Sequence, residues 1–268
     1  MQFRPSVLQQ FQRPFTNTSS LSFRRPSPRW QAQNDSPYSP RSAPNPNTPH
    51  IVAGSIVLAC AGVFAANWKW EIEARKGSHE AIQWLRTFRR NMVFSMDNIK
   101  EGRYWVYLTS TFTHISGLHL ILNMMSFWSF GPMFVAQFGT RMLAILWVGS
   151  GVVGAVAQER LWKQANTHIN QAAVGASGSI LGICTALTCV MPRMRVEFFW
   201  IPMPMWSFMA GAAVFSITAI NQGWLPFVGH ADHLGGMAFG LVWGLAVLRR
   251  RTLLKFPAAP KFPRIPPR

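Results

Sequence analysis

Six intervals without a charged residue follow one another along this chain, and they restrict its possible folds more than any other feature. Their apolar cores cover about residues 51–67, 115–136, 142–158, 172–191, 203–220 and 233–248. None of them alternates apolar with polar residues, as the strands of a membrane β-barrel do. A backbone in lipid must satisfy its own hydrogen bonds, and an α-helix does so within one segment. We therefore predict an all-α membrane protein with six transmembrane helices.

The formal charge of +17 is concentrated at the two ends of the chain. Residues 1–50 carry six Arg and a single acid, Asp35, and residues 249–268 carry seven Lys or Arg and no acid. Basic ends around an apolar body are typical of a membrane protein, whereas a nucleic-acid-binding protein gathers its charge in a groove or patch. We expect the lipid bilayer as a partner and no nucleic acid.

The composition divides the chain into three parts. Residues 1–50 are rich in Arg, Ser, Gln and Pro, which cannot bury a core, so a disordered tail is expected there. An Arg-rich, Ser-rich and acid-poor start fits a mitochondrial transit peptide, and a basic cytoplasmic tail is the alternative. Residues 51–250 form the predicted six-helix domain, and residues 251–268 a basic C-terminal tail.

Polar residues interrupt the second, fourth and sixth apolar intervals. The three clusters are "THISGLHLILN" with His114, His119 and Asn123, "GASG" around Ser177, and "HADHLGG" with His230 and His233. Polar side chains inside a membrane are costly, which makes each cluster a candidate functional site. If the helices alternate in direction, these three run parallel, and all three clusters lie toward their N-terminal ends. The clusters are therefore expected at a similar depth on one side of the membrane.

Glycine spacing predicts how these helices come together. Two GxxxG stripes follow the clusters, one with Gly178 and Gly182 and one with Gly236 and Gly240. Such stripes let two helices approach closely, which would bring His233 to hydrogen-bond distance from Ser177. A serine hydroxyl needs a neighbouring base to act as a nucleophile, and no Lys lies inside these intervals.

The polar cluster of the second interval supplies hydrogen-bond donors for an oxyanion. His119 and Asn123 share one helical face, and their N–H groups could stabilise the negative charge that develops during acyl transfer. Asp232 is adjacent to His233 in sequence and points elsewhere on a helix, so a Ser–His dyad is predicted. A serine beside glycine can also serve packing alone. Another alternative is a metal or haem site built from His114, His119, His230 and His233.

These motifs resemble those of the rhomboid intramembrane serine proteases. The resemblance rests on H-x4-H-x3-N in the second interval, GxSG in the fourth and H-x2-G-x3-G in the sixth, and it covers about residues 51–250. Mitochondrial members are similar around "EGRYWVYLTSTFTH" and "HLGGMAFG". The chain departs from many members at Val106, which follows Trp105 where an Arg is common. It also departs at Val135, where some members have Glu, and at Leu181, where some have Tyr.

The resemblance implies a rhomboid-like bundle with a water-filled cavity and a first loop lying partly in the membrane. It implies that Ser177 is the nucleophile, His233 the general base, and His119 and Asn123 part of the oxyanion hole. Gly175, Gly178, Gly182, Gly236 and Gly240 are assigned to helix packing at the site. The implied activity is cleavage of transmembrane or membrane-adjacent segments of membrane proteins, without a cofactor or metal. A non-catalytic rhomboid-like scaffold that binds such proteins is the alternative, and the mitochondrial inner membrane is the expected location.

Overall fold

The computed structural model describes residues 45–165, 171–198, 200–250 and 252. Most of the expected transit peptide and nearly all of the expected C-terminal tail lie outside these residues. Seven helical elements make up the apolar body: α1 (Thr48–Arg75), α5 (Gly117–Phe138), α6 (Thr140–Gln164), α7 (Ser177–Val190), α8 (Met205–Gln222), α9 (His230–Trp243) and the π-helical η4 (Gly244–Arg249) that continues α9.

Each of the six apolar intervals overlaps one of these helices, with α9 and η4 counted together. Among the described residues, four helices are long and apolar enough to cross a membrane: α1, α5, α6 and the continuous α9–η4. The α7 helix is apolar but has only 14 residues. The prediction of a helical membrane protein is thus confirmed, with four helices that meet the length and hydropathy expected of a span.

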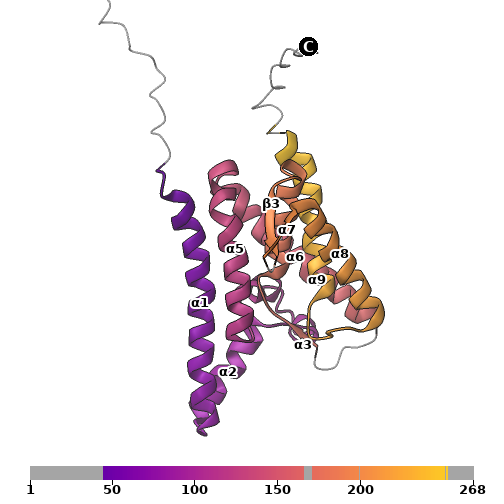
Figure 1. The fold of residues 1–268 in the computed structure, drawn as a ribbon. Coiled ribbons are helices and arrows are strands. Elements are labelled where there is room, and N and C mark those ends of the chain that lie inside the picture. The colour runs from indigo at the N-terminus through magenta and orange to yellow at the C-terminus, as the bar shows by residue number, and fades with distance from the viewer. Residues whose placement is uncertain (1–44, 166–170, 199, 251, 253–268) are drawn as a thin grey trace, which may run out of the picture. The chain divides into compact units, whose positions relative to one another are not determined.

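The short α7 helix lies at the centre of the bundle (Figure 1). It contacts α5, α6, α8 and α9, and most of its residues are buried. The α1 helix packs on α5 at one side, and α8 packs on α7 and α9 at the other (Figure 1). Because neighbouring helices surround α7, it does not need the full length of a lipid-exposed span.

The first helix is longer than its apolar interval. It begins at Thr48, inside the segment assigned to the N-terminal tail, and continues through charged residues to Arg75. No Gly or Pro interrupts residues 68–75, and the helix ends just before Gly77, whose φ of +90° is poorly tolerated by other residues. The apolar interval alone therefore predicts too short a helix at both ends.

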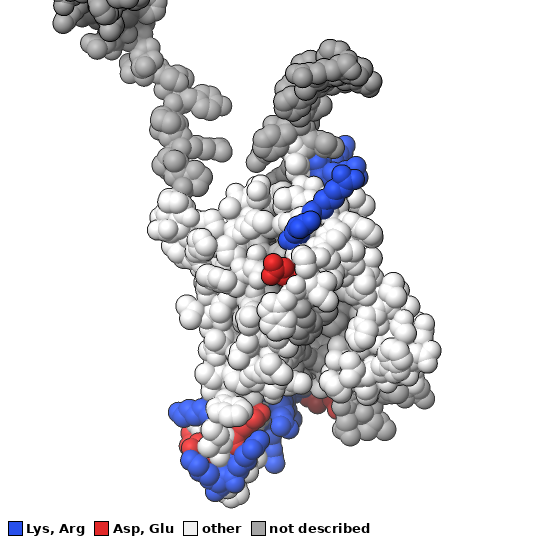
Figure 2. All heavy atoms as spheres, viewed as in Figure 1, with Lys and Arg blue, Asp and Glu red and all other residues white. Residues whose placement is uncertain are grey.

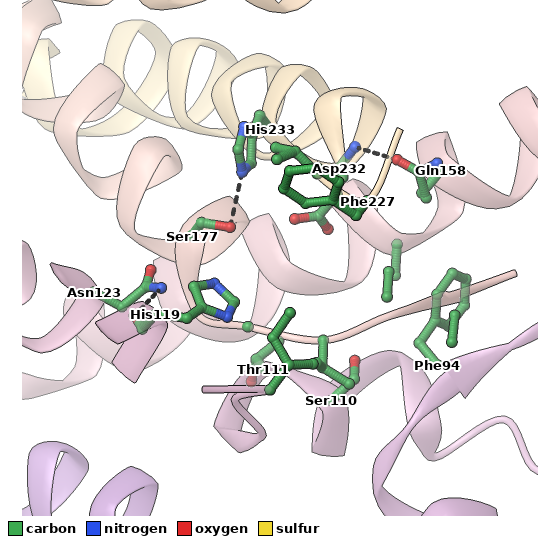
Figure 3. Close-up of a pocket in the computed structure, with 18 of the residues that line it drawn as sticks. Phe94, Ser110, Thr111, His119, Asn123, Gln158, Ser177, Phe227, Asp232 and His233 are labelled. Atoms are coloured by element: carbon green, nitrogen blue, oxygen red, sulfur yellow. Dashed lines mark hydrogen bonds between the residues drawn. The ribbon is translucent and has the colours of Figure 1, made fainter. Parts of the chain in front are cut away.

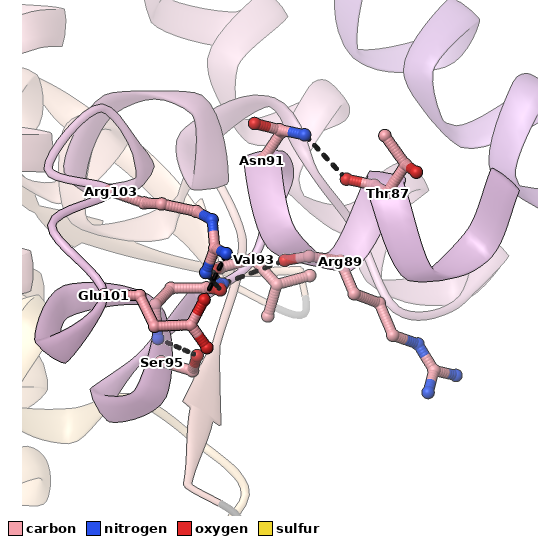
Figure 4. Close-up of polar contacts among 8 residues, drawn as sticks. Thr87, Arg89, Asn91, Val93, Ser95, Glu101 and Arg103 are labelled. Atoms are coloured by element: carbon pink, nitrogen blue, oxygen red, sulfur yellow. Dashed lines mark hydrogen bonds and ion pairs between the residues drawn. The ribbon is translucent and has the colours of Figure 1, made fainter. Parts of the chain in front are cut away.

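The long connection between α1 and α5 is an ordered loop with its own short elements. These are α2 (His79–Met92), β1 (Phe94–Ser95), α3 (Met96–Lys100), α4 (Val106–Thr109) and the 3-10 helix η3 (Ser110–Phe112). Buried Asn98 holds them together, because its amide donates to the carbonyls of Arg89 (2.9 Å) and Val93 (2.7 Å) and its Oδ1 accepts from Arg103. Arg103 also pairs with Glu101 (Figure 4).

Two small antiparallel sheets depart from the predicted all-α fold. In the first, β1 pairs with β2 (Ala172–Ala173), so that Phe94 faces Ala173. In the second, β3 (Arg195–Phe198) pairs with β4 (Ile201–Pro204) between α7 and α8. The first sheet matters for the site, since it ties the first loop to the segment that leads into α7.

Charged side chains gather at the two ends of the described bundle. Figure 2 shows them around α2 and its neighbours at one end and beside the C-terminal turn of η4 at the other. The surface between is almost free of charge on this face, except over β3, where Arg195 and Glu197 are exposed. This distribution fits a bundle embedded in lipid with charged ends in water.

Candidate active site

Ser177 and His233 meet between α7 and α9. Ser177 is the first residue of α7, and His233 lies in the first turn of α9. The Oγ of Ser177 and the Nε2 of His233 are 2.8 Å apart, at hydrogen-bond distance (Figure 3). A neutral imidazole at this position can accept the serine proton, which is the arrangement that activates a serine nucleophile.

Glycines make this approach of α7 and α9 possible. A methyl group added at Gly236 would lie 2.2 Å from the carbonyl oxygen of Gly178, and one added at Gly240 would lie 2.0 Å from that of Gly182. Both distances are far below any real contact, so only glycine fits at these points. The backbones therefore touch directly over two successive turns, and this contact fixes His233 beside Ser177.

His119 and Asn123 line the same cavity from α5. The hydroxyl of Ser116 caps this helix by accepting from the backbone N–H of His119 (3.2 Å). The side-chain amide of Asn123 donates to the carbonyl of His119 (2.9 Å), which leaves its second N–H hydrogen for another acceptor. Figure 3 shows both side chains on the α5 side of Ser177.

Gly175 has a different place from the helix packing expected for it. It precedes α7, has a φ of +132°, and its N–H donates to the carbonyl of Ser110 (3.0 Å). A methyl group at Gly175 would lie 2.7 Å from the ring of His119. Gly175 thus lets the chain turn between the first loop and the His119 ring, whereas Gly178, Gly182, Gly236 and Gly240 lie at helix contacts.

The cavity around the dyad has a volume of about 630 Å³. It extends beyond Ser177 and His233 to residues outside the sequence motifs of the predicted site: Phe94, Ser110, Thr111, Gln158, Trp162 and Asp232. Phe94 stacks on Trp162 with ring centroids 5.4 Å apart. The sequence gives little signal for these residues, because they come together from the first loop, α6 and α9.

The departure at Val106 changes how the first loop is anchored. Val106 is fully buried and belongs to a second apolar cluster with Phe94 and Trp162. Next to it, the hydroxyl of Tyr107 donates to Glu159 of α6. Burial and this hydrogen bond both raise the pKa of Tyr107 above its ordinary value. The loop is therefore held to α6 by apolar packing and a neutral phenol.

Asp232 does not support His233 directly. Its carboxylate accepts a hydrogen bond from the backbone of Gly178 at the start of α7. It also lies against Gly154 of α6, where an added methyl group would be 2.4 Å from Oδ1. The backbone N–H of Asp232 donates to Gln158 Oε1 (3.3 Å). The carboxylate thus faces α6 and α7, away from the imidazole of its neighbour.

The four histidines form two pairs. The rings of His114 and His119 are 5.1 Å apart between centroids, and those of His230 and His233 are 6.1 Å apart. Burial, together with the nearby His119, lowers the pKa of His114 in the loop before α5 to about 4. Within the described ranges, no three His, Cys, Asp or Glu side chains converge as ligands for a metal ion.

Comparisons with known proteins lead to one family. The chain is 29% identical over 174 residues to presenilin-associated rhomboid-like protein A, mitochondrial, of Danio rerio, covering 61% of this chain and 44% of that protein. It is 33% identical over 139 residues to the Homo sapiens presenilin-associated rhomboid-like protein, mitochondrial, covering 50% and 35%. Rhomboid protein 1, mitochondrial, of Saccharomyces cerevisiae is 28% identical over 139 residues, covering 50% and 39%.

The matches span less than half the length of each of these three relatives. The mitochondrial relatives and the apolar helices together support a multi-pass mitochondrial membrane protein. The sequence model of the Rhomboid domain matches residues 101–250, which is more than half of the chain and contains every residue of the site described above except Phe94. The protein therefore belongs to the rhomboid family.

Proposed function

We propose that the protein is an intramembrane serine endopeptidase that cleaves transmembrane or membrane-adjacent segments of other membrane proteins. The observation that carries this proposal is the 2.8 Å contact between Ser177 Oγ and His233 Nε2 in a cavity within a rhomboid bundle. Membership of the rhomboid family, whose members generally act as serine proteases, agrees with it.

The reaction follows from the geometry of the dyad. His233 Nε2 takes the proton of Ser177 as its Oγ attacks the carbonyl carbon of the scissile bond. The tetrahedral intermediate collapses, His233 returns the proton to the leaving amine, and an acyl-enzyme remains on Ser177. A water molecule then gives a proton to His233 as its oxygen attacks the ester carbon. The intermediate expels the Oγ of Ser177, which takes that proton back from His233, and the new carboxyl end of the product is released.

Three groups are proposed to stabilise the oxyanion. The backbone N–H of Ser177 lies at the N-terminus of α7, where helix N–H groups and the helix dipole favour negative charge. His119 and the free amide hydrogen of Asn123 approach from α5. Preorganised donors of this kind are typically worth a factor of about 10² to 10³ in rate each.

The proposed topology has six spans, with α7 and α8 crossing as part of the protein-packed bundle. An even number of spans leaves both chain ends on one side, and the start of α1 and the end of η4 do lie at the same end of the bundle (Figure 1). By the positive-inside rule these basic ends face the matrix of the inner membrane. Ser177 and His233 then open toward the intermembrane space.

The test is cleavage of a transmembrane reporter by purified protein in lipid vesicles. Wild type should cleave, whereas Ser177→Ala and His233→Gln should each lose roughly 10³-fold or more in rate. A chelator should change nothing. Cleavage that survives Ser177→Ala would refute the dyad.

The alternatives have their own outcomes in this experiment. Loss of cleavage on chelation would favour a metal site at the histidines. Binding of the reporter by wild type and Ser177→Ala alike, with no cleavage by either, would favour the scaffold. Only the protease predicts that removal of a single hydroxyl abolishes turnover while reporter binding remains.

A further inference from the structure

Among the described residues that line the cavity of the dyad, Asp232 is the one acid. Figure 3 shows its carboxylate pointing from α9 into the space between Ser177 and Phe227. Since the carboxylate accepts from the backbone of Gly178, it lies next to the residue that follows the proposed nucleophile. The carboxylate of Asp232 takes no part in the proposed mechanism.

The carboxylate has no cationic partner in the described part of the chain. No Lys or Arg lines the cavity, and none of the ion pairs formed within the described residues includes Asp232. A half-buried carboxylate is costly to keep in an apolar surrounding unless a cation or several donors compensate it. One backbone N–H of α7 supplies part of this compensation, and a cation arriving with the substrate would supply the rest.

The direction of the cavity indicates which substrate side chain could reach Asp232. In the proposed reaction, the carbonyl oxygen of the scissile bond is directed to His119 and Asn123, and its leaving nitrogen is directed to His233. The third substituent of the attacked carbon then points away from α5. That substituent is the residue on the amino side of the scissile bond. Figure 3 shows Asp232 on this opposite side of Ser177, with Phe94 farther along.

Resting on the proposed protease function, we infer that Asp232 makes this subsite selective for a basic substrate side chain directly before the scissile bond. The ammonium group of a substrate lysine would pair with the carboxylate. The methylene groups of that lysine would pack in the apolar part of the cavity, where Phe94 and Trp162 stack. A substrate carboxylate at the same position would be repelled.

The experiment compares transmembrane reporters that differ only at this residue, which is Lys, Met or Glu. Wild type should cleave the Lys reporter at least about tenfold more efficiently, in kcat/KM, than the Met reporter, with Glu poorest. Asp232→Asn keeps a carbonyl oxygen for Gly178 but loses the charge, so the Lys-to-Met ratio should fall close to one. Asp97→Asn removes the same charge from an exposed site on α3 and should keep the wild-type ratio.

A binding measurement separates this inference from the protease function. Ser177→Ala should bind the Lys reporter about tenfold more tightly than Ser177→Ala/Asp232→Asn, whether or not wild type shows turnover. Equal affinities, or a Lys-to-Met ratio that Asp232→Asn leaves unchanged, would overturn the selectivity. Absence of cleavage combined with this difference in affinity would instead reject the protease and keep the basic subsite.

Discussion

Replacing Gly240 with alanine should separate α9 from α7 and disable the dyad. The added methyl group would lie 2.0 Å from the carbonyl oxygen of Gly182, 2.7 Å from its carbonyl carbon and 2.8 Å from its Cα. All three neighbours are backbone atoms of a central helix, so no flexible side chain can move aside. An ordinary contact of 3.4 Å requires the helices to move apart by more than ~1 Å at this point.

Such overpacking typically lowers the free energy of unfolding by about 1 to 3 kcal/mol. Because the contact is between rigid backbones, we expect Gly240→Ala to lie near the upper end, at about 3 kcal/mol. The displacement should also lengthen the distance of 2.8 Å between Ser177 and His233, so activity should fall at temperatures where the variant remains folded. The assay is the free energy of unfolding in mixed micelles, together with reporter cleavage.

Gly211 provides a matched control. It lies in α8, and a methyl group added there would meet nothing within 4 Å. Gly211→Ala should therefore be neutral or stabilise the protein by up to about 1 kcal/mol through helix propensity. If Gly240→Ala were as stable and as active as Gly211→Ala, the direct backbone contact between α7 and α9 would be refuted.

Three further variants test the surroundings of the dyad. Gly175→Ala should abolish cleavage, because a side chain is strained at its φ of +132° and the new methyl group would lie 2.7 Å from the His119 ring. Reporter cleavage at the wild-type rate would contradict this. Asn98→Ala should lower the free energy of unfolding by about 2 to 3 kcal/mol, because it leaves two carbonyls of the first loop without their donor. The control Asn91→Ala removes one side-chain hydrogen bond within a helix and should lower the free energy of unfolding clearly less. Burial lowers the pKa of His114 to about 4 in the folded protein, whereas its ordinary pKa in the unfolded chain is near 6.5. The unfolded chain therefore binds the proton first as pH falls. Wild type should therefore lose about 2 kcal/mol more stability than His114→Gln between pH 7 and pH 5, as measured by unfolding at both values.

The helices and the meeting of Ser177 with His233 could be predicted from the sequence, because local patterns specify them. Uninterrupted apolar intervals predict helices in lipid, and the four-residue spacing of Gly236 and Gly240 marks a helix face that can touch another backbone. Ser177 and His233 follow from the same patterns, because each lies at the start of a helix that carries a glycine stripe.

Other parts of the site depend on residues far apart in the chain. The pairing of Phe94 with Ala173 carries no sequence signal, since two-residue strands have no periodicity. Asp232 was expected to point away from His233, and it does, but its contact with Gly154 of α6 could not be foreseen. The charged end of α1 was missed because apolarity marks where lipid contact ends, whereas Gly77 determines where the helix ends.

The most direct test of the dyad is the site and rate of modification by a fluorophosphonate, read by mass spectrometry of the intact and digested protein. If His233 activates Ser177, one adduct should form, on Ser177 of the wild type, and it should be lost or slowed at least about 10³-fold in His233→Gln. Ser179→Ala should keep the adduct, because Ser179 is fully buried with its hydroxyl donating to the carbonyl of Trp147 (2.8 Å). An adduct on another residue, or one that forms on Ser177 equally fast without His233, would show that His233 does not activate Ser177.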